Sequence, residues 1–451
     1  MNTNNNSILV PTLRDLLAAE DGKAVRSFCE SKHPVAVAEL LPDLSMEEVL
    51  LVFRYVGTRL FAEIYSHLDD EIQVKIVRIL SYDQIAALLA EMSPDDRADL
   101  FKQMPEELQA AVLPAIAHAE REDIRRLSAY AEGTAGAVMT SDYAALSPEL
   151  TASEALEYLR EAAPRKETIY YAYVVEKEHR LLGFVSLKDL IVARRDARVG
   201  DIMHRDVIFA RVEDDQEEVA RKFRKYDLLA LPVINGGDAL VGIVTVDDVL
   251  DIAEEEVTHD FHKMAPVGLM KVNLNDAGLG VLFRARVPWL LVLVFMNIFS
   301  GAGIAYFEDT LTAMISLAFF LPLLIDSGGN AGSQSATLMV RALATGDVRM
   351  RDWLHLLGKE VAVSLTLGVS MAVAVGLIAT LRAPDIVVVV ALTMVCTVVF
   401  GSLVGMCLPF VLTKLRMDPA TASAPLITSL ADIGGVLIYF TIATWWLGVA
   451  A

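Results

Sequence analysis

Long apolar runs in the last third of the chain constrain the fold most. Five of them follow one another, at residues 287–307, 311–327, 361–381, 386–412 and 426–449. Each can cross the ~30 Å hydrocarbon core of a bilayer, the second by extending into the polar stretch after it. The sequence therefore predicts an α-helical membrane domain of five transmembrane helices over residues 284–451.

The rest of the chain is acidic. The 451 residues carry a formal net charge of -20 although 54% are hydrophobic, and nearly all carboxylates precede residue 260. We therefore expect a multi-domain protein in which an acidic soluble half joins the membrane half. An acidic surface repels nucleic acid and is compatible with metal cations. No nucleophile triad, phosphate loop or metallohydrolase spacing occurs, so we expect no enzyme.

Two features predict the orientation in the cell (inner or plasma) membrane. The N-terminus lacks the charged and apolar regions of a signal peptide, so the soluble half is expected to remain cytoplasmic. The short loops on one side carry basic residues such as Arg284, Arg349 and Lys414, whereas the other side holds Glu308 and Asp309. By the positive-inside rule the N-terminal domains are cytoplasmic and the C-terminus is outside.

Short helical patterns recur from about residue 34 to 119. Ser45 with Glu48 forms a capping box, while Ser93, Pro94 and Asp96 supply an N-cap, an N1 proline and an N3 acid. Helices this short cannot bury a face alone. Residues 1–134 are therefore predicted to form an all-α superhelical domain.

Near residue 137 the sequence pattern changes to β-branched runs that alternate with helical patterns. This alternation occurs twice. Ser186 and Asp189 of GFVSLKD match Thr245 and Asp248 of GIVTVDD, and a hydroxyl followed three residues later by an acid suits a helix cap. The tandem pattern resembles the cystathionine-β-synthase (CBS) domain pair, a βαββα module that commonly dimerises and senses small ligands. It predicts α/β CBS domains at 135–199 and 200–256, followed by a connecting helix and linker at 257–283.

One carboxylate, Asp432, lies well inside the last apolar run. A charged side chain deep in a bilayer is unfavourable by at least ~2.5 kcal/mol on insertion scales, and such residues usually face a bundle interior or a water-filled path. Asp432 is therefore a candidate site for a transported cation. The alternative is a protonated or hydrogen-bonded group that helps helices pack.

The second run leads into PLLIDSGGNAGSQSATLMV, which is too rich in Gly, Ser and Asn to face lipid. Counting at ~1.5 Å per residue brings Gly328, Gly329 and Asp432 to a similar depth. Glycines also allow carbonyls to leave the helical ladder where they line a cavity. Oxygen donors at one level favour a hard cation such as Mg2+. A glycine-rich packing seam is the alternative. The polar residues that share a helical face are Asn330, Ser333, Gln334 and Thr337.

The helical array, the CBS pair, an acidic connecting helix and runs that carry GGNAGSQSATL, RALATGD and PLITSLADIGG follow in that order. In this order they resemble the MgtE family of magnesium channels over essentially the whole chain. The resemblance implies a homodimer with the pore on the two-fold axis, lined by the second and fifth spans. The family's essential pore acid is carried onto Asp432, and the path would comprise Asp432, Gly328, Gly329, Asn330, Ser333, Thr337 and Thr428. Three positions depart from the family's pattern: Ser333, Ala424 and Asp326, the last an extra carboxylate to which the resemblance gives no role.

Acidic residues of the soluble half are candidates for a cytosolic Mg2+ sensor. Asp247, Asp251, Glu254 and Glu255 share a helical face, where a divalent cation would relieve their repulsion. The family uses such acids as its sensor, whereas a solvated acidic face is the alternative. The candidate ligands outside the pore are Asp95, Asp96, Asp99, Asp214, Glu218, Asp227, Asp247, Asp248, Asp251, Glu254, Glu255, Glu256, His259, Asp260 and Asp418.

Together these features predict Mg2+ influx through a channel or transporter that closes when cytosolic Mg2+ binds the acidic domains. The resemblance also implies that the CBS cleft binds an adenine nucleotide such as ATP near Tyr170, Tyr171, Ser186 and Asp189, although the hydroxyl and the acid equally serve as caps. Two alternatives remain: a proton-coupled secondary transporter for Co2+, Mn2+ or Ni2+, and a membrane-anchored CBS sensor that signals to a partner.

Overall fold

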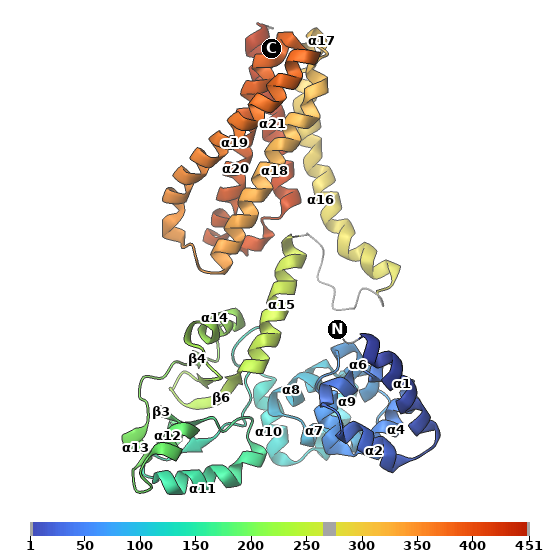
Figure 1. The fold of residues 1–451 in the computed structure, drawn as a ribbon, viewed down its shortest axis with the longest axis vertical. Helices are drawn as coiled ribbons and strands as arrows, with labels where there is room; N and C mark the ends of the chain where they lie inside the picture. Colours follow the sequence, from blue (N-terminus) through green and yellow to red (C-terminus); the bar gives the residue numbers. More distant parts are fainter. Residues whose placement is uncertain (1–2, 265–276, 449–451) are drawn as a thin grey trace. The chain divides into compact units, whose positions relative to one another are not determined.

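The chain divides into two compact units, residues Met1–Glu254 and Glu255–Ala451, both drawn in Figure 1. The computed structural model describes residues 3–264 and 277–448, with all their side chains except those of residues 3–7, 70, 71, 260 and 264. The first unit contains a helical domain and two α/β modules. The second contains long helices.

The helical domain is built from short helices, as the sequence predicts. Ser45 N donates to Glu48 Oε2 over 2.6 Å and Glu48 N donates to Ser45 Oγ over 3.3 Å, which forms the predicted capping box. Ser93 and Pro94 stand at the predicted N-cap and N1 positions, but Ser93 accepts no N–H from its helix. The helices are α1 (Thr3–Ala18), α2 (Gly22–Glu30), α3 (Pro34–Ala38), η1 (Leu41–Asp43), α4 (Met46–Val56), α5 (Thr58–Tyr65), α6 (Asp70–Val77), α7 (Tyr82–Glu91), α8 (Pro94–Gln103), α9 (Glu106–Val112), η2 (Leu113–Ala115) and α10 (His118–Leu127).

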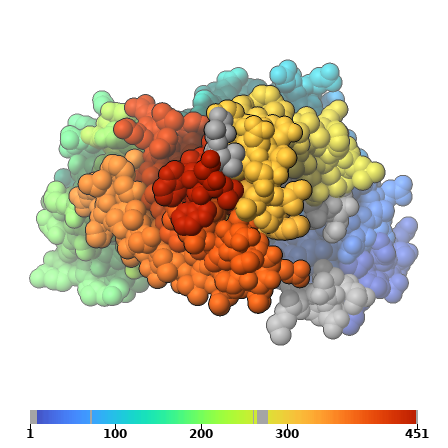
Figure 2. Space-filling view, turned by 90° about the horizontal axis from the view of Figure 1, so that it is seen from above, coloured from blue at the N-terminus to red at the C-terminus, as the bar shows by residue number. Residues whose placement is uncertain are grey.

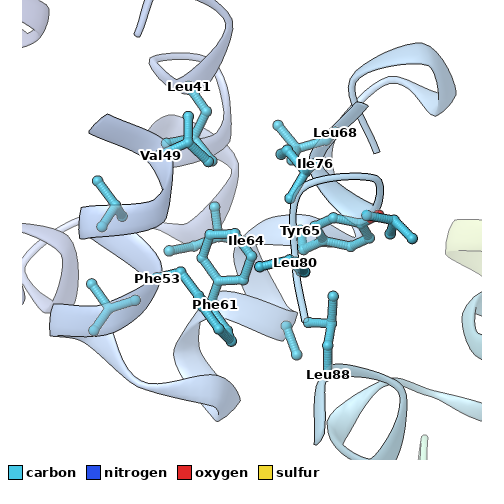
Figure 3. Close-up of a cluster of buried hydrophobic side chains, with 14 of the residues drawn as sticks. Leu41, Val49, Phe53, Phe61, Ile64, Tyr65, Leu68, Ile76, Leu80 and Leu88 are labelled. Atoms are coloured by element: carbon cyan, nitrogen blue, oxygen red, sulfur yellow. The ribbon is translucent and has the colours of Figure 1, made fainter. Parts of the chain in front are cut away.

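One apolar core holds these helices together. Each helix is too short to bury its apolar face alone, so the helices share this core. Figure 3 shows Phe53 of α4 and Phe61 of α5 facing each other at its centre, with ring centroids 4.6 Å apart and edge to face. The buried Tyr65 hydroxyl donates to the carbonyl of Gln73 over 2.7 Å, so its polar group is satisfied. Stacking of short helices on a shared core confirms the predicted array.

Two small sheets form the α/β modules, and their registers repeat. Each sheet has a parallel and an antiparallel pair, in the orders β1-β2-β3 and β4-β5-β6. Val174 opposes Gly183 in the first sheet and Val233 opposes Gly242 in the second. The elements are β1 (Ala145–Leu146), α11 (Ala152–Ala162), η3 (Ala163–Arg165), β2 (Tyr171–Val175), η4 (Lys177–His179), β3 (Leu181–Ser186), α12 (Leu187–Val192), α13 (Val199–Ile202), β4 (Ala210–Arg211), α14 (Gln216–Tyr226), β5 (Ala230–Ile234), β6 (Leu240–Thr245) and α15 (Val246–Met264).

The two modules exchange their leading segments, which explains the repeated glycines. Thr140 pairs with Ile243 of the second module, and His204 pairs with Phe184 of the first. A Cβ atom on Gly242 would lie 2.7 Å from the Thr140 carbonyl oxygen, and one on Gly183 would lie 2.6 Å from that of His204. Only glycine permits this close approach. Because each module pairs with a segment that precedes the other, the two modules form one structural unit.

Helix α15 differs from the predicted domain division. It runs without interruption from Val246 to Met264, so the expected boundary between residues 256 and 257 falls inside a helix. The predicted connecting helix is therefore a continuation of the last CBS helix as far as Met264. The expected linker lies partly at residues 265–276, outside the described residues.

Long helices dominate the second unit. Among its described residues, four helical segments are long and apolar enough to cross a membrane: 279–306, 350–382, 384–414 and 424–447. Helix α18 has comparable length, but its polar middle lowers its hydropathy. The helices are α16 (Leu279–Tyr306), α17 (Glu308–Ala313), α18 (Leu317–Ala344), η5 (Met350–Asp352), α19 (Trp353–Arg382), η6 (Pro384–Ile386), α20 (Val387–Lys414), η7 (Pro419–Thr421) and α21 (Ala424–Leu447).

The predicted continuous run at 311–327 is wrong, because the chain turns between α17 and α18. Met314 has an extended backbone that ends α17, and the N–H of Leu317 bonds back to its carbonyl. The Tyr439 hydroxyl of α21 donates to the Leu317 carbonyl over 3.0 Å and fixes the start of α18. Helices α18, α20 and α21 pack against one another, α19 packs on α20 and α16 on α21. Figure 2 looks along this bundle, with its last helices in orange and red.

Candidate functional site

Glycines allow α18 to approach α20 very closely. A Cβ atom on Gly401 would lie 2.0 Å from the Gly328 carbonyl oxygen, and one on Gly405 would lie 2.0 Å from that of Gly332. Helix α18 stays regular through this contact. The glycines could have allowed carbonyls to leave the helical ladder, but here they seat one regular helix against another. This contact matches the packing seam that the sequence left open.

Helix α21 runs antiparallel to α18 and brings Asp432 to the level of the glycines. A Cβ atom on Gly332 would lie 2.9 Å from Ile427, one on Gly329 3.1 Å from Thr428, and one on Gly435 3.7 Å from Ile325. In these contacts the residue numbers decrease along α18 while they increase along α21. Asp432, which lies between Thr428 and Gly435, is therefore level with residues 326–329 of α18. Asp432 of α21 and the glycines of α18 therefore lie at the same depth, as the residue count along each apolar run predicted.

One polar face of α18 is exposed. We call it the α18 polar stripe: Asp326, Asn330, Gln334 and Thr337, all exposed and spaced three or four residues apart. Asn330 Nδ2 donates to Asp326 Oδ2 over 2.9 Å, and Thr337 Oγ1 donates to the Ser333 carbonyl over 2.9 Å. Thr428 Oγ1 likewise donates to the Pro425 carbonyl over 3.0 Å. Hydroxyls that donate within their own helix keep their oxygen lone pairs for another group.

Ser333 lies beside the stripe and is half-buried. Its hydroxyl oxygen is buried and has no hydrogen-bond partner among residues 3–264 and 277–448. Asp432 is also half-buried, and the negative charge of Asp326 acts on its carboxylate. The structure therefore brings an acid that had no assigned role to the level of the predicted pore acid.

A second group of acids meets within the first unit, between the helical domain and the CBS pair. Burial and the neighbouring Asp95 raise the pKa of Asp96 to about 7. Burial and Asp95 also raise the pKa of Asp248 to about 8, with Asp247 contributing. Asp95 itself has its pKa raised by burial, and its Oδ1 atom has no hydrogen-bond partner in the described part of the chain.

Glu167 belongs to the same group, although no pattern in the sequence indicates it. Burial raises its pKa to about 7, and Asp95 and Asp247 add to the shift. We call Asp95, Asp96, Glu167, Asp247 and Asp248 the acidic cluster. An orphaned carboxylate oxygen among mutually repelling acids fits a divalent cation. Over the described ranges, however, no three His, Cys, Asp or Glu side chains already converge in a metal-holding arrangement.

The other predicted sensor acids have different surroundings. Asp251 lies next to Asp247 and Glu254, and burial and these charges raise its pKa. Asp99 pairs with Lys102 at 3.3 Å. Lys222 Nζ lies 2.8 Å from Asp214 and 3.9 Å from Glu218, so a lysine already balances these acids.

The remaining candidates stand outside the acidic cluster. Asp227 ends α14 in the left-handed conformation, with φ 51°. Asp418 accepts the Ala420 N–H over 2.8 Å as a cap and pairs with Lys263. The last candidates follow along α15 in the second unit: Glu255, Glu256, His259 and Asp260, the last with a side chain outside the described residues.

The predicted nucleotide residues divide into a cap and a cleft. Ser186 Oγ accepts the Asp189 N–H over 3.0 Å and Ser186 N donates to Asp189 Oδ2 over 3.2 Å, which makes them a capping box. Tyr171 lines a cleft of about 200 Å³, whereas Tyr170 is exposed. The cleft is lined by Tyr171, Tyr173, Phe184, Asp206, Val207, Ile208, Tyr226, Leu228, Ala230 and Pro232.

Comparisons with known proteins match the helical domain, the two α/β modules and the helices from α18 to α21. The family model described as a divalent cation transporter matches residues 321–442. The MgtE intracellular N domain matches residues 32–133, and CBS domains match 135–196 and 199–255. The fold and these matches define a multi-pass membrane transporter with a cytosolic helical domain and a CBS pair.

Full-length relatives narrow this class. The magnesium transporter MgtE of Thermus thermophilus is 40% identical over 96% of this chain and 98% of its own length. That of Bacillus subtilis is 33% identical, over 96% of each chain. The crystal structure of the cytosolic domain of the Mg2+ channel MgtE in complex with ATP is 38% identical, with a TM-score of 0.52 over 54% of this chain and 99% of that one. The chain belongs to the MgtE family.

Proposed function

We propose that this protein conducts Mg2+ into the cell and that Asp432 binds the ion in its path. The observation that carries the proposal is the meeting of Asp432 with the α18 polar stripe at one depth of the bundle. A carboxylate inside a membrane bundle is retained where it serves a transported ion. The names of the relatives favour Mg2+ as that ion.

The donors available along this path suit a hydrated ion. Mg2+ releases its water reluctantly and is usually held by one or two carboxylates with several waters kept. Asp432 supplies the charge, while Asn330, Ser333, Thr337 and Thr428 supply neutral oxygens. Gly328 and Gly329 contribute by seating α18 on its neighbours. The protein would therefore recognise the ion mostly through its water shell.

Two copies of the chain would complete the path. The α18 polar stripe is exposed in one chain, and polar side chains within a membrane are retained where they face protein or water. A second copy related by a two-fold axis would enclose the two stripes and pair two Asp432 side chains. This arrangement requires α18 as a fifth span, with the N-terminal domains cytoplasmic and the C-terminus outside.

Cytosolic Mg2+ would close this path through the acidic cluster. Without Mg2+ the cluster acids repel one another or hold protons, as their raised pKa values indicate. Bound Mg2+ would replace the protons and draw the helical domain and the CBS pair together. The Asp251 and Glu254 side chains would extend the negative surface along α15. A ligand that binds the compact state better shifts the equilibrium toward it.

An adenine nucleotide would bind the aromatic cleft of the CBS pair. Tyr171, Tyr173 and Phe184 offer ring surfaces for a base. Arg221, Lys222 and Lys225 line a neighbouring pocket that shares Val207, Ile208 and Tyr226 with the cleft, which suits phosphates. The ATP complex of the related cytosolic domain supports this assignment.

Flux into proteoliposomes tests the proposal. The purified protein, Asp432→Asn and the control Asp385→Asn are compared, since Asp385 is an exposed acid of the same unit. We expect Asp432→Asn to lower Mg2+ flux at least roughly tenfold, equivalent to about 1.4 kcal/mol of lost ion stabilisation. Asp385→Asn should leave it unchanged. Mg2+ on the cytoplasmic side should inhibit the flux.

The same experiment separates the rival functions. Flux that collapses with the proton gradient would indicate a proton-coupled transporter. A folded protein without flux at any Mg2+ concentration would indicate a membrane-anchored sensor. Equal flux in Asp432→Asn and the unaltered protein would remove Asp432 as the ion site.

A further inference from the structure

A second acid of the membrane unit, Asp326, has no role in the function described so far. It is the first residue of the α18 polar stripe, it is exposed, and it lies level with Asp432. In the part of the chain that the structure describes, neither acid forms an ion pair with a basic side chain. Two carboxylates without a basic partner, on adjacent helices of a membrane bundle, must either hold protons or be balanced by a positive charge from elsewhere, such as a bound cation.

The neighbours of Asp326 orient it without neutralising it. Asn330 Nδ2 donates to its Oδ2 atom over 2.9 Å, one turn further along the same face. This hydrogen bond occupies one carboxylate oxygen of Asp326 and leaves the second, Oδ1, available to another group. The charge of Asp326 also acts on Asp432, so the two carboxylates share one local environment. A divalent cation near both would replace their repulsion with attraction.

We propose that Asp326 is a second carboxylate of the ion path, which raises its affinity for divalent cations. This inference rests on the proposed function, because it assigns Asp326 to the path that Asp432 defines. Asp432 supplies the indispensable charge. Asp326 adds a second negative charge at the same depth, oriented by Asn330, and attracts the hydrated ion from a distance. Mg2+ gains twice the attraction of a monovalent cation from each added charge.

The affinity of the path for Mg2+ tests this role. Flux is measured against Mg2+ concentration for the full-length protein, Asp326→Asn, Asp326→Glu and the control Asp309→Asn, an exposed acid on α17. We expect the half-saturating concentration to rise roughly tenfold in Asp326→Asn, equivalent to about 1.4 kcal/mol, with the maximal flux retained. Asp326→Glu keeps the charge, so its half-saturating concentration should stay within about threefold of that of the unaltered protein, equivalent to about 0.65 kcal/mol. Asp309→Asn should not differ from it.

Selectivity gives a second readout. The flux of Na+ relative to Mg2+ should increase in Asp326→Asn, because a monovalent ion loses less when one charge is removed. An unchanged half-saturating concentration and an unchanged Na+ to Mg2+ ratio would overturn the inference. So would loss of the fold in both Asp326→Asn and Asp326→Ala, because Asp326 would then be structural. The outcome for Asp432→Asn keeps the two proposals apart: if that variant transports normally, the proposed path itself fails.

Discussion

At the scale of single residues, the helix contact between α18 and α20 depends on missing side chains. The Cβ positions of Gly401 and Gly405 fall 2.0 Å from carbonyl oxygens of the facing helix. Backbone cannot move aside as a flexible side chain can. The contact therefore admits no residue larger than glycine unless the two helices separate.

We expect Gly405→Ala to destabilise the membrane unit by about 1–3 kcal/mol, the usual effect of overpacking a core. Gly358→Ala in α19 is the matched control, because a Cβ atom there meets nothing within 4 Å. The control should be neutral or stabilising, since alanine favours helix by about 1 kcal/mol over glycine. Thermal unfolding in detergent measures both variants, and equal unfolding temperatures would contradict the close contact.

The sequence predicts residues with local roles better than residues with distant partners. Ser45 and Ser186 were predictable as caps because their partners lie three residues away. Asp432 could be singled out from the sequence because a carboxylate in an apolar run is unusual in itself, and its role as an ion site stays a prediction. Glu167 and the depth of Asp326 beside Asp432 depend on how separate helices and strands pack, and one sequence contains no such information.

At the scale of elements, periodicity predicts helices well and their breaks poorly. The short helices of the N-terminal domain and the repeated strands lie where the patterns indicate. The turn between α17 and α18 was missed because residues 311–327 are mostly apolar and contain no Gly, although Ser316 stands at the N-cap of α18. A domain boundary was expected after Glu256, whereas α15 continues through that position to Met264.

The start of α18 depends on one hydrogen bond from α21. The Tyr439 hydroxyl, which is fully buried, donates to the Leu317 carbonyl over 3.0 Å. Tyr439→Phe keeps the ring and leaves that carbonyl without this donor, so we expect a loss of about 1–2 kcal/mol in stability. Tyr306→Phe, which alters an exposed tyrosine, should have no effect. Chemical unfolding in detergent measures the free energy of unfolding of both variants. A value for Tyr439→Phe equal to that of the unaltered protein would show that this hydrogen bond makes no net contribution to stability.

At the scale of the whole molecule, charge and apolar surface are divided between the two units. Most carboxylates of a chain with net charge -20 lie in the first unit, while the membrane helices lie in the second. The acidic cluster concentrates this charge between the helical domain and the CBS pair. Its protonation should therefore control how firmly these domains hold together.

This arrangement predicts a stability that falls with rising pH in the absence of divalent cations. Asp96, Glu167 and Asp248 have pKa values near 7 to 8 in the fold, whereas unfolded carboxyls titrate near pH 4. Between these values the folded state binds more protons, so the free energy of unfolding decreases as pH rises, and the loss is complete near pH 9, about one pH unit above the pKa of Asp248.

Hydrogen exchange of α8 and of the start of α15 in the full-length protein measures this loss, with a chelator present. Protection should decrease between about pH 6 and 8. Asp96→Asn removes one of the titrating groups, so its protection should depend less steeply on pH. Glu106→Gln, an exposed acid of α9, is the control and should follow the unaltered protein. Protection that increases with pH would contradict the raised pKa values.

Mg2+ should reverse the effect of high pH, because it competes with protons for the same carboxylates. Metal ligands must be deprotonated, so Mg2+ binding at pH 7 should release protons that Asp96, Glu167 and Asp248 still hold. Calorimetric titration in two buffers of different ionisation enthalpy measures the release. The number of protons released per chain should fall toward zero near pH 9, where the cluster is already ionised, and Asp96→Asn should release fewer at pH 7. Binding heats that are identical in both buffers at pH 7 would place the bound Mg2+ elsewhere than the acidic cluster.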